Sequence, residues 1–113
     1  MLRILLPTDF SDNSFEAIRY ALLTFKKLKC KFYLLHTYMP PIYHVEYAFG
    51  GPGQIGNGDD IFKEVVVSQL DKLQNRLEHQ YENGKHSFES YARLNTLTNE
   101  VNVMVETHNI DVI

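Results

Sequence analysis

The sequence has little cysteine and no long apolar run. Cys30 is the only cysteine, so the chain cannot form an internal disulfide. A single unpaired thiol fits a reducing compartment, and we expect a cytoplasmic protein. A membrane-spanning helix needs about 20 consecutive apolar residues, and no stretch approaches that length. We therefore expect no association with a membrane.

The chain also lacks an excess of positive charge. Its 113 residues include 11 basic and 14 acidic side chains, for a net charge of −3, so we expect no nucleic-acid partner. Residues 1–36 carry six basic and three acidic side chains, whereas residues 37–113 carry five basic and eleven acidic ones. The basic excess comes mostly from Lys26, Lys27, Lys29 and Lys31. A helix C-terminus whose dipole favours cations is our first interpretation, and a patch for phosphate or a partner is the alternative.

Signatures of catalysis and metal binding are missing as well. The five histidines, which are His36, His44, His79, His86 and His108, show no metal-ligand spacing, and the pair formed by His44 and Glu46 is isolated. No nucleophile–base pair and no redox dithiol can be argued from the residues. We expect no catalytic residue, no metal site and no enzymatic activity.

What the sequence does contain is an alternation of strand and helix patterns. Residues 3–7 and 32–36 are continuous apolar runs, which indicate strands buried on both faces. Between them apolar residues recur every three or four positions, as on one face of an amphipathic helix, at Phe15, Ile18, Leu22, Phe25 and Leu28. Asn13 and Glu16 resemble a capping box at the start of this helix.

Residues 39–58 are predicted to form one long loop. Met39-Pro40-Pro41 stops the second strand, and five glycines follow between Gly50 and Gly58. Residues 51–56 fit the pattern G-x-G-x-x-G, but a dinucleotide fingerprint turns directly from a strand into a helix. This one is a dozen residues from the second strand. We interpret it as a loop, with a ligand lid as the alternative.

A second helix, a third strand and a third helix are expected next. Asp59-Asp60 would cap a long helix with a buried stripe at Phe62, Val66, Leu70, Leu73, Leu77 and Tyr81, and Glu82-Asn83-Gly84 would end it. Residues 88–93 alternate as in an edge strand, and residues 97–108 have helical spacing. Residues 110–113 look like the opening of a fourth strand. The order βαβαβαβ predicts a three-layer, doubly wound α/β domain with a parallel sheet.

In such folds ligands bind beyond the carboxyl ends of the strands. Pro7 to Ser11 and His36 to Tyr38 occupy those positions. Asp9 can accept hydrogen bonds from a ribose or an adenine, or it can organise its own turn. His36 ends a buried run, and a core histidine with satisfied hydrogen bonds is the simplest interpretation.

The order of these motifs resembles the universal stress protein family. Residues 4–11, Ile-Leu-Leu-Pro-Thr-Asp-Phe-Ser, followed by Ser14 and Ala17, are similar to the opening of its members. Residues 32–38, Phe-Tyr-Leu-Leu-His-Thr-Tyr, resemble the second strand, and residues 101–113 resemble the third helix and the start of the fourth strand. The form of residues 7–11 and the loop with Tyr43, His44 and Glu46 are most similar to tandem-domain bacterial members.

The resemblance implies a five-stranded parallel sheet of order 3-2-1-4-5 and, in many members, ATP binding. In those members the Asp after the first strand and the residue after the second-strand His contact the adenosine, which here match Asp9 and Thr37. Pro7 and Thr8 line the same turn, and His36 is the matching histidine. These five residues are the predicted nucleotide site.

One family element does not appear in the sequence. The triphosphate loop follows the fourth strand in the family, and residues 1–113 would form a single domain of strand order 3-2-1-4 without that loop, the last helix or the fifth strand. We therefore expect weak or lost ATP binding. The strand edge left open predicts a homodimer or higher oligomer, or completion by a second domain of the same family. The alternative functions are an interaction module that binds no nucleotide and a fragment of a tandem protein.

Overall fold

The computed structural model describes residues 1–38 and 53–113, with the side chains of residues 53–61 left aside. Six elements follow one another as strand and helix, which confirms the predicted α/β class. They are β1 (Leu2–Pro7), α1 (Asp12–Thr24), β2 (Cys30–Tyr38), α3 (Gly53–Gln80), β3 (His86–Leu94) and α4 (Leu97–His108).

The three strands form one parallel sheet in the order β1-β2-β3. The register pairs Pro7 with Leu35 and Leu35 with Tyr91, so the carboxyl ends of β1 and β2 lie side by side. Residues 110–113, predicted to open a fourth strand, make only an isolated parallel bridge between Val112 and Ile4. The fourth position in the predicted strand order therefore stays a prediction.

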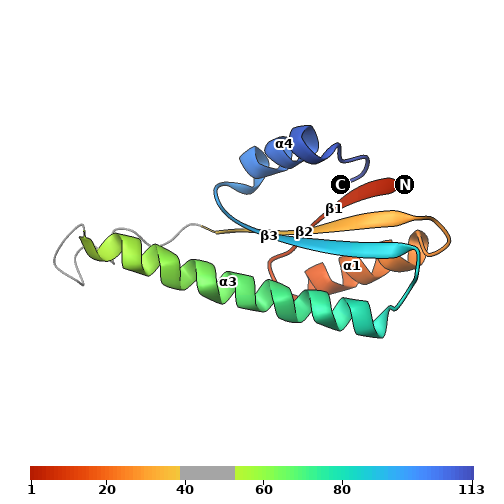
Figure 1. Ribbon diagram of the computed structural model, residues 1–113, viewed down its shortest axis with the longest axis horizontal. Coiled ribbons are helices and arrows are strands. Elements are labelled where there is room, and N and C mark those ends of the chain that lie inside the picture. The colour runs from red at the N-terminus through yellow and green to blue at the C-terminus, as the bar shows by residue number, and fades with distance from the viewer. Residues whose placement is uncertain (39–52) are drawn as a thin grey trace.

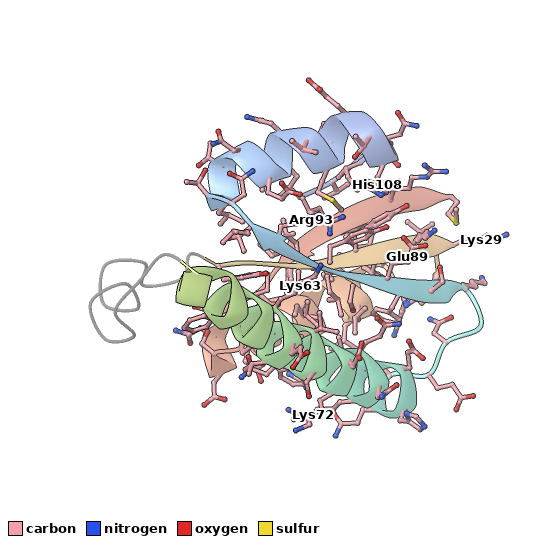
Figure 2. The ribbon with its side chains drawn as sticks, turned by 60° about the vertical axis from the view of Figure 1, so that its left-hand side comes forward. Lys29, Lys63, Lys72, Glu89, Arg93 and His108 are labelled. Atoms are coloured by element: carbon pink, nitrogen blue, oxygen red, sulfur yellow. The ribbon has the colours of Figure 1, made fainter. Side chains whose placement is uncertain are left out.

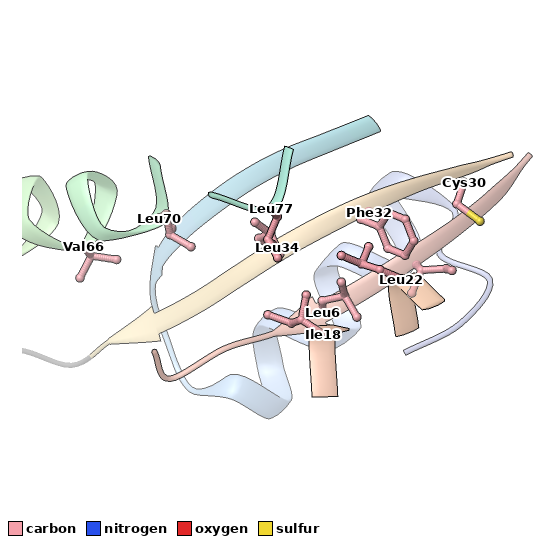
Figure 3. Close-up of a cluster of buried hydrophobic side chains, with 10 residues drawn as sticks. Leu6, Ile18, Leu22, Cys30, Phe32, Leu34, Val66, Leu70 and Leu77 are labelled. Atoms are coloured by element: carbon pink, nitrogen blue, oxygen red, sulfur yellow. The ribbon is translucent and has the colours of Figure 1, made fainter. Parts of the chain in front are cut away.

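Helices cover both faces of the sheet, which gives the predicted three layers. Figure 1 shows α1 and α3 on one face and α4 on the other. Side chains alternate between faces along a strand, so Ile4 and Leu6 join the cluster beneath α1 and α3, and Leu5 joins the one beneath α4. The first cluster is the larger and runs the length of β2 (Figure 3). Two-sided burial explains why the β1 and β2 sequences are continuously apolar.

The predicted loop over residues 39–58 is wrong in its last part. Helix α3 begins at Gly53, and Asp59-Asp60 therefore lies inside the helix and does not cap it. Residues 39–52, which include the Pro-Pro and tyrosine-rich stretch, lie outside the described residues. The helix can extend back through these glycines because each residue added to a nucleated helix completes one more hydrogen bond. This gain offsets the cost of about 1 kcal/mol for an interior glycine.

Both ends of α1 also differ from the prediction. Ser11, and not Asn13, is the N-cap, because its Oγ accepts a hydrogen bond from the Ser14 amide at 3.2 Å. The helix ends at Thr24 with no basic residue in its last turn, so the lysines of residues 26–31 are not helix-dipole partners. Leu28 is 49% exposed and outside the helix.

The outer edge of β3 is protected by polar side chains. Gln74 of α3 donates to the Phe88 carbonyl at 3.3 Å and accepts from the Ser90 hydroxyl. Arg93 donates to the Ala92 carbonyl at 3.3 Å. Groups that occupy edge carbonyls hinder the addition of another strand.

Among the described helices, none is long and apolar enough to cross a membrane.

Candidate functional site

A cavity of about 400 Å³ opens at the carboxyl ends of β1 and β2. All five residues of the predicted nucleotide site line it, which are Pro7, Thr8, Asp9, His36 and Thr37. Sequence reasoning missed five further lining residues, which are Ser11, Asn13, Ser14, Leu35 and Leu97. The structure therefore brings together residues from β1, β2 and the first turns of α1 and α4.

Parallel pairing explains why the two predicted segments meet. Pro7 is the register partner of Leu35, and the Thr8 amide donates to the Leu35 carbonyl at 2.8 Å. Thr8 therefore leaves the sheet beside His36, while β2 continues along β3 to Tyr38. Pro7 has no amide hydrogen and ends β1 there.

A chain of hydroxyl groups fixes the turn between β1 and α1. The Ser14 hydroxyl donates to the Ser11 carbonyl at 2.9 Å, so its oxygen accepts from the Thr8 hydroxyl at 3.0 Å. The Thr8 oxygen in turn accepts from the Phe10 amide at 3.0 Å. Thr8 is buried, and both the donor and the acceptor roles of its hydroxyl are satisfied.

His36 holds the same turn from the side of β2. Its Nδ1 lies 2.7 Å from the Thr8 carbonyl oxygen, and because a carbonyl only accepts, Nδ1 carries the proton. The imidazole also packs on the Phe10 ring, with 4.6 Å between centroids. Phe10 has a φ of 65°, a left-handed conformation that is uncommon for a large side chain. The contacts from His36 and Thr8 offset the strain.

Asp9 lies exposed at the mouth of the cavity. Its Oδ1 accepts a hydrogen bond from the Ser11 amide at 2.9 Å. Hydrogen bonds from Ser11, and then from Ser14, lower the pKa of the Asp9 carboxyl, so it is ionised at neutral pH. The turn-organising role predicted for Asp9 is thus present, and the ligand-facing role is compatible with it because a carboxylate has further acceptor sites.

The cavity can bind a small polar molecule with an apolar portion. Pro7, Leu35 and Leu97 offer apolar surface, and the hydroxyl, amide and carboxylate groups offer hydrogen bonds. A signal for the missed residues of α1 was present in the sequence. Residues 11–14, Ser-Asp-Asn-Ser, are typical of a helix start, and this start closely follows the predicted site residue Asp9. Leu97 follows the carboxyl end of β3, which is parallel to β2, so the rule that ligands bind beyond strand ends was a signal for it as well.

The described residues contain no group of three or more His, Cys, Asp or Glu side chains that could hold a metal ion. His44 and Glu46 lie outside the described part of the chain. Cys30 is a buried free thiol, and burial raises its pKa.

Comparison with solved structures shows the fold of universal stress proteins. The chain superposes on the universal stress protein UspA from Lactobacillus plantarum with a TM-score of 0.73 and 15% identity, over 98% of this chain and 74% of that one. It superposes on MJ0577, solved as a hypothetical protein to assign its biochemical function, with a TM-score of 0.68 and 16% identity, over 99% and 72% of the two chains. No family model matches the sequence. No curated protein matches it either.

Proposed function

We propose that this chain is a universal stress protein-like domain that binds the adenosine part of an adenine nucleotide. The observation that carries the proposal is the convergence of Pro7, Thr8, Asp9, His36 and Thr37 on one cavity at the carboxyl ends of β1 and β2. Asp9 and Thr37 would accept and donate hydrogen bonds to the ribose and the base. The fold shared with universal stress proteins supports this assignment.

The domain would act by binding and not by turnover, in a cytoplasmic stress response. The Nδ1 of His36 bonds to a backbone carbonyl, and the hydroxyls of Thr8 and Ser14 bond to each other. A hydrolytic nucleophile needs a base within hydrogen-bond reach, and these pairings do not provide one. Incubation with Mg-ATP should release no phosphate above the rate without protein.

Calorimetric titration with adenosine and with Mg-ATP tests the proposal. We expect saturable binding of at least one of the two ligands, and a loss of about tenfold or more in the Asp9→Ala variant, which removes a charged hydrogen-bond acceptor. Asp12→Ala is the matched control, because Asp12 is the next carboxylate along the chain, in the first turn of α1, and does not line the cavity. No saturable binding of either ligand would refute the proposed function.

A second candidate function is self-association through β1. A groove of about 360 Å³ runs along β1 and α1 to Val112 and Ile113, and its other lining includes the exposed Tyr20. On this edge the backbone groups of Arg3 and Leu5 already bond to residues 111–112, so the apolar groove beside the strand would make the contact. We propose that a second copy of the chain covers the β1 edge.

Light scattering after size exclusion tests this candidate. The chain should elute as a dimer or larger species, and Tyr20→Asp should make it monomeric by placing a charge in the groove. Ser87→Asp, on the exposed start of β3, is the control and should leave the assembly intact. A monomer at high protein concentration would exclude self-association and direct attention to a second domain as the partner.

A further inference from the structure

The described lining of the ligand cavity contains no Lys or Arg side chain. It does contain the Asp9 carboxylate, which is ionised at neutral pH. Residues 39–61, whose side chains the structure does not describe, contain no Lys or Arg in the sequence either. That stretch therefore cannot supply a Lys or Arg side chain to the cavity.

The basic residues of the chain are committed elsewhere. Arg19 pairs with Glu16 at 3.3 Å and Arg93 pairs with Glu100 at 3.0 Å, while Arg76 lies over the Phe15 ring at 4.0 Å. Lys29 lies at the far end of the sheet and Lys72 on α3 (Figure 2). The other basic side chains also lie outside the cavity lining, and they are Arg3, Lys26, Lys27, Lys31, Lys63 and Lys85.

The first turn of α1 does not compensate for this lack of cations. A helix N-terminus favours an anion because its amides are unpaired and its dipole is positive there. Here the Asp9 carboxylate already accepts from the Ser11 amide at 2.9 Å, the Ser11 hydroxyl accepts from the Ser14 amide at 3.2 Å, and Asp12 adds a second carboxylate in the first turn. Two amides at this helix start therefore already have acceptors from the protein, and two carboxylates beside them disfavour a further anion.

We infer that the cavity selects an uncharged nucleoside over a nucleoside triphosphate. The inference rests on the proposed function and names the ligand class of the same site. A neutral nucleoside places its hydroxyls against carboxylate and hydroxyl groups and its base against Pro7, Leu35 and Leu97. Every added phosphate brings negative charge toward Asp9, and no Lys or Arg among the described lining residues offsets the repulsion. Arg93 is the register partner of Thr37, but it is paired with Glu100.

Titration of the wild-type chain with adenosine, AMP and ATP at two salt concentrations tests the inference. Affinity should fall in that order, with adenosine bound about tenfold or more tightly than ATP at low ionic strength. Salt screens charge repulsion, so raising NaCl from about 0.02 M to about 0.5 M should strengthen ATP binding and leave adenosine binding unchanged. A site built on cations would show the opposite salt dependence.

The Asp9→Asn variant isolates the role of the charge. The amide keeps an acceptor oxygen and removes the carboxylate, so the ratio of adenosine affinity to ATP affinity should fall several-fold. Glu16→Gln is the control, because Glu16 is an exposed carboxylate of α1 outside the cavity lining, and it should leave the ratio unchanged. ATP binding that is tighter than adenosine binding would overturn this inference and leave the proposed function standing. Absence of binding by all three ligands would overturn both.

Discussion

The two ends of the sheet are stabilised in the same way but carry opposite charge. At the carboxyl end, Thr8 and His36 tie the β1–α1 turn to β2 through side-chain and backbone hydrogen bonds. At the opposite end, the α3–β3 turn is tied to the α1–β2 turn. Asn83 donates to the Lys26 carbonyl at 2.8 Å, and Lys85 donates to the Lys27 carbonyl at 3.1 Å.

The charges on these two frameworks differ in sign. The opposite end presents four exposed lysines that form no salt bridge among the described residues, which are Lys26, Lys27, Lys29 and Lys85, beside the exposed carboxylate of Glu82. The cavity end presents Asp9 and Asp12, and its cation Arg93 is paired with Glu100. The sheet thus separates the cations of residues 1–36 from the site that would need them for a phosphate. The turns at the carboxyl end therefore position the candidate ligand site, and the placement of charged side chains restricts which ligands can bind there.

The largest effect is expected from a substitution in the hydrophobic core near the lysine-bearing end of the sheet. Phe32 is fully buried, and its ring lies 4.9 Å from the His86 ring and 5.4 Å from the Phe88 ring, between centroids. Phe32→Ala should lower the free energy of unfolding by about 3–5 kcal/mol, because it leaves a cavity. Urea unfolding followed by circular dichroism measures the loss. Phe62→Ala, at a side chain that is 38% exposed, should cost far less, and equal losses would contradict the packing described here.

A matched pair of variants compares the two turn frameworks. Thr8→Val removes the hydroxyl that bonds to Phe10 and Ser14, and Asn83→Ala removes the amide that bonds to Lys26. Each should lower the free energy of unfolding by about 1–2 kcal/mol, since each leaves polar groups unpaired. Calorimetric titration should separate them, because only Thr8→Val should weaken adenosine binding. Weaker binding in Asn83→Ala would mean that the two ends are coupled.

The Tyr91→Phe variant tests the contacts that hold Lys31, which, unlike the four exposed lysines, has an acidic partner. Lys31 pairs with Glu89 at 2.7 Å, and Glu89 also accepts from the Tyr91 hydroxyl at 2.6 Å. Loss of that hydroxyl should cost about 1 kcal/mol. Burial and the hydrogen bond to Glu89 raise the pKa of Tyr91 to about 12.

The raised pKa gives Tyr91 a pH signature. A phenol whose pKa is higher in the folded state stabilises the protein below its unfolded pKa of about 10, and this stabilisation is lost as pH rises toward 12. Absorbance titration of tyrosinate should therefore show a phase near pH 12 that Tyr91→Phe removes. Persistence of that phase in the variant would assign it to another tyrosine.

The smallest expected effect concerns Asp9 in the absence of ligand. Hydrogen bonds from Ser11 and Ser14 lower the pKa of its carboxyl in the folded state. The stabilisation is therefore present above the unfolded pKa of about 3.9 and is lost as pH falls through the folded value. Melting temperatures measured between about pH 5 and pH 2 should fall more steeply for the wild type than for Asp9→Asn. Parallel curves would show that these hydrogen bonds contribute nothing to stability.

The sequence by itself determined the α/β class, the three strands, the third helix and five residues of the candidate site. These features are local, because apolar runs specify strands buried on both faces and a proline ends β1. The parallel sheet brings the carboxyl ends of neighbouring strands together, so Asp9 and Thr37 could be assigned to one site from chain position and family resemblance. Their convergence needed no detail of packing.

The tertiary structure decided the boundaries of α1 and α3, the completion of the cavity and the distribution of charge. Ser11 and not Asn13 caps α1, because the helix begins at Asp12 and the Ser11 hydroxyl accepts from the Ser14 amide. Leu97 lines the cavity because α4 begins just after the carboxyl end of β3, at the edge of the sheet where β1 and β2 also end. The lysines of residues 26–31, for which a phosphate or partner patch was the alternative interpretation, lie at the far end from the cavity, because β2 separates the two positions by its full length.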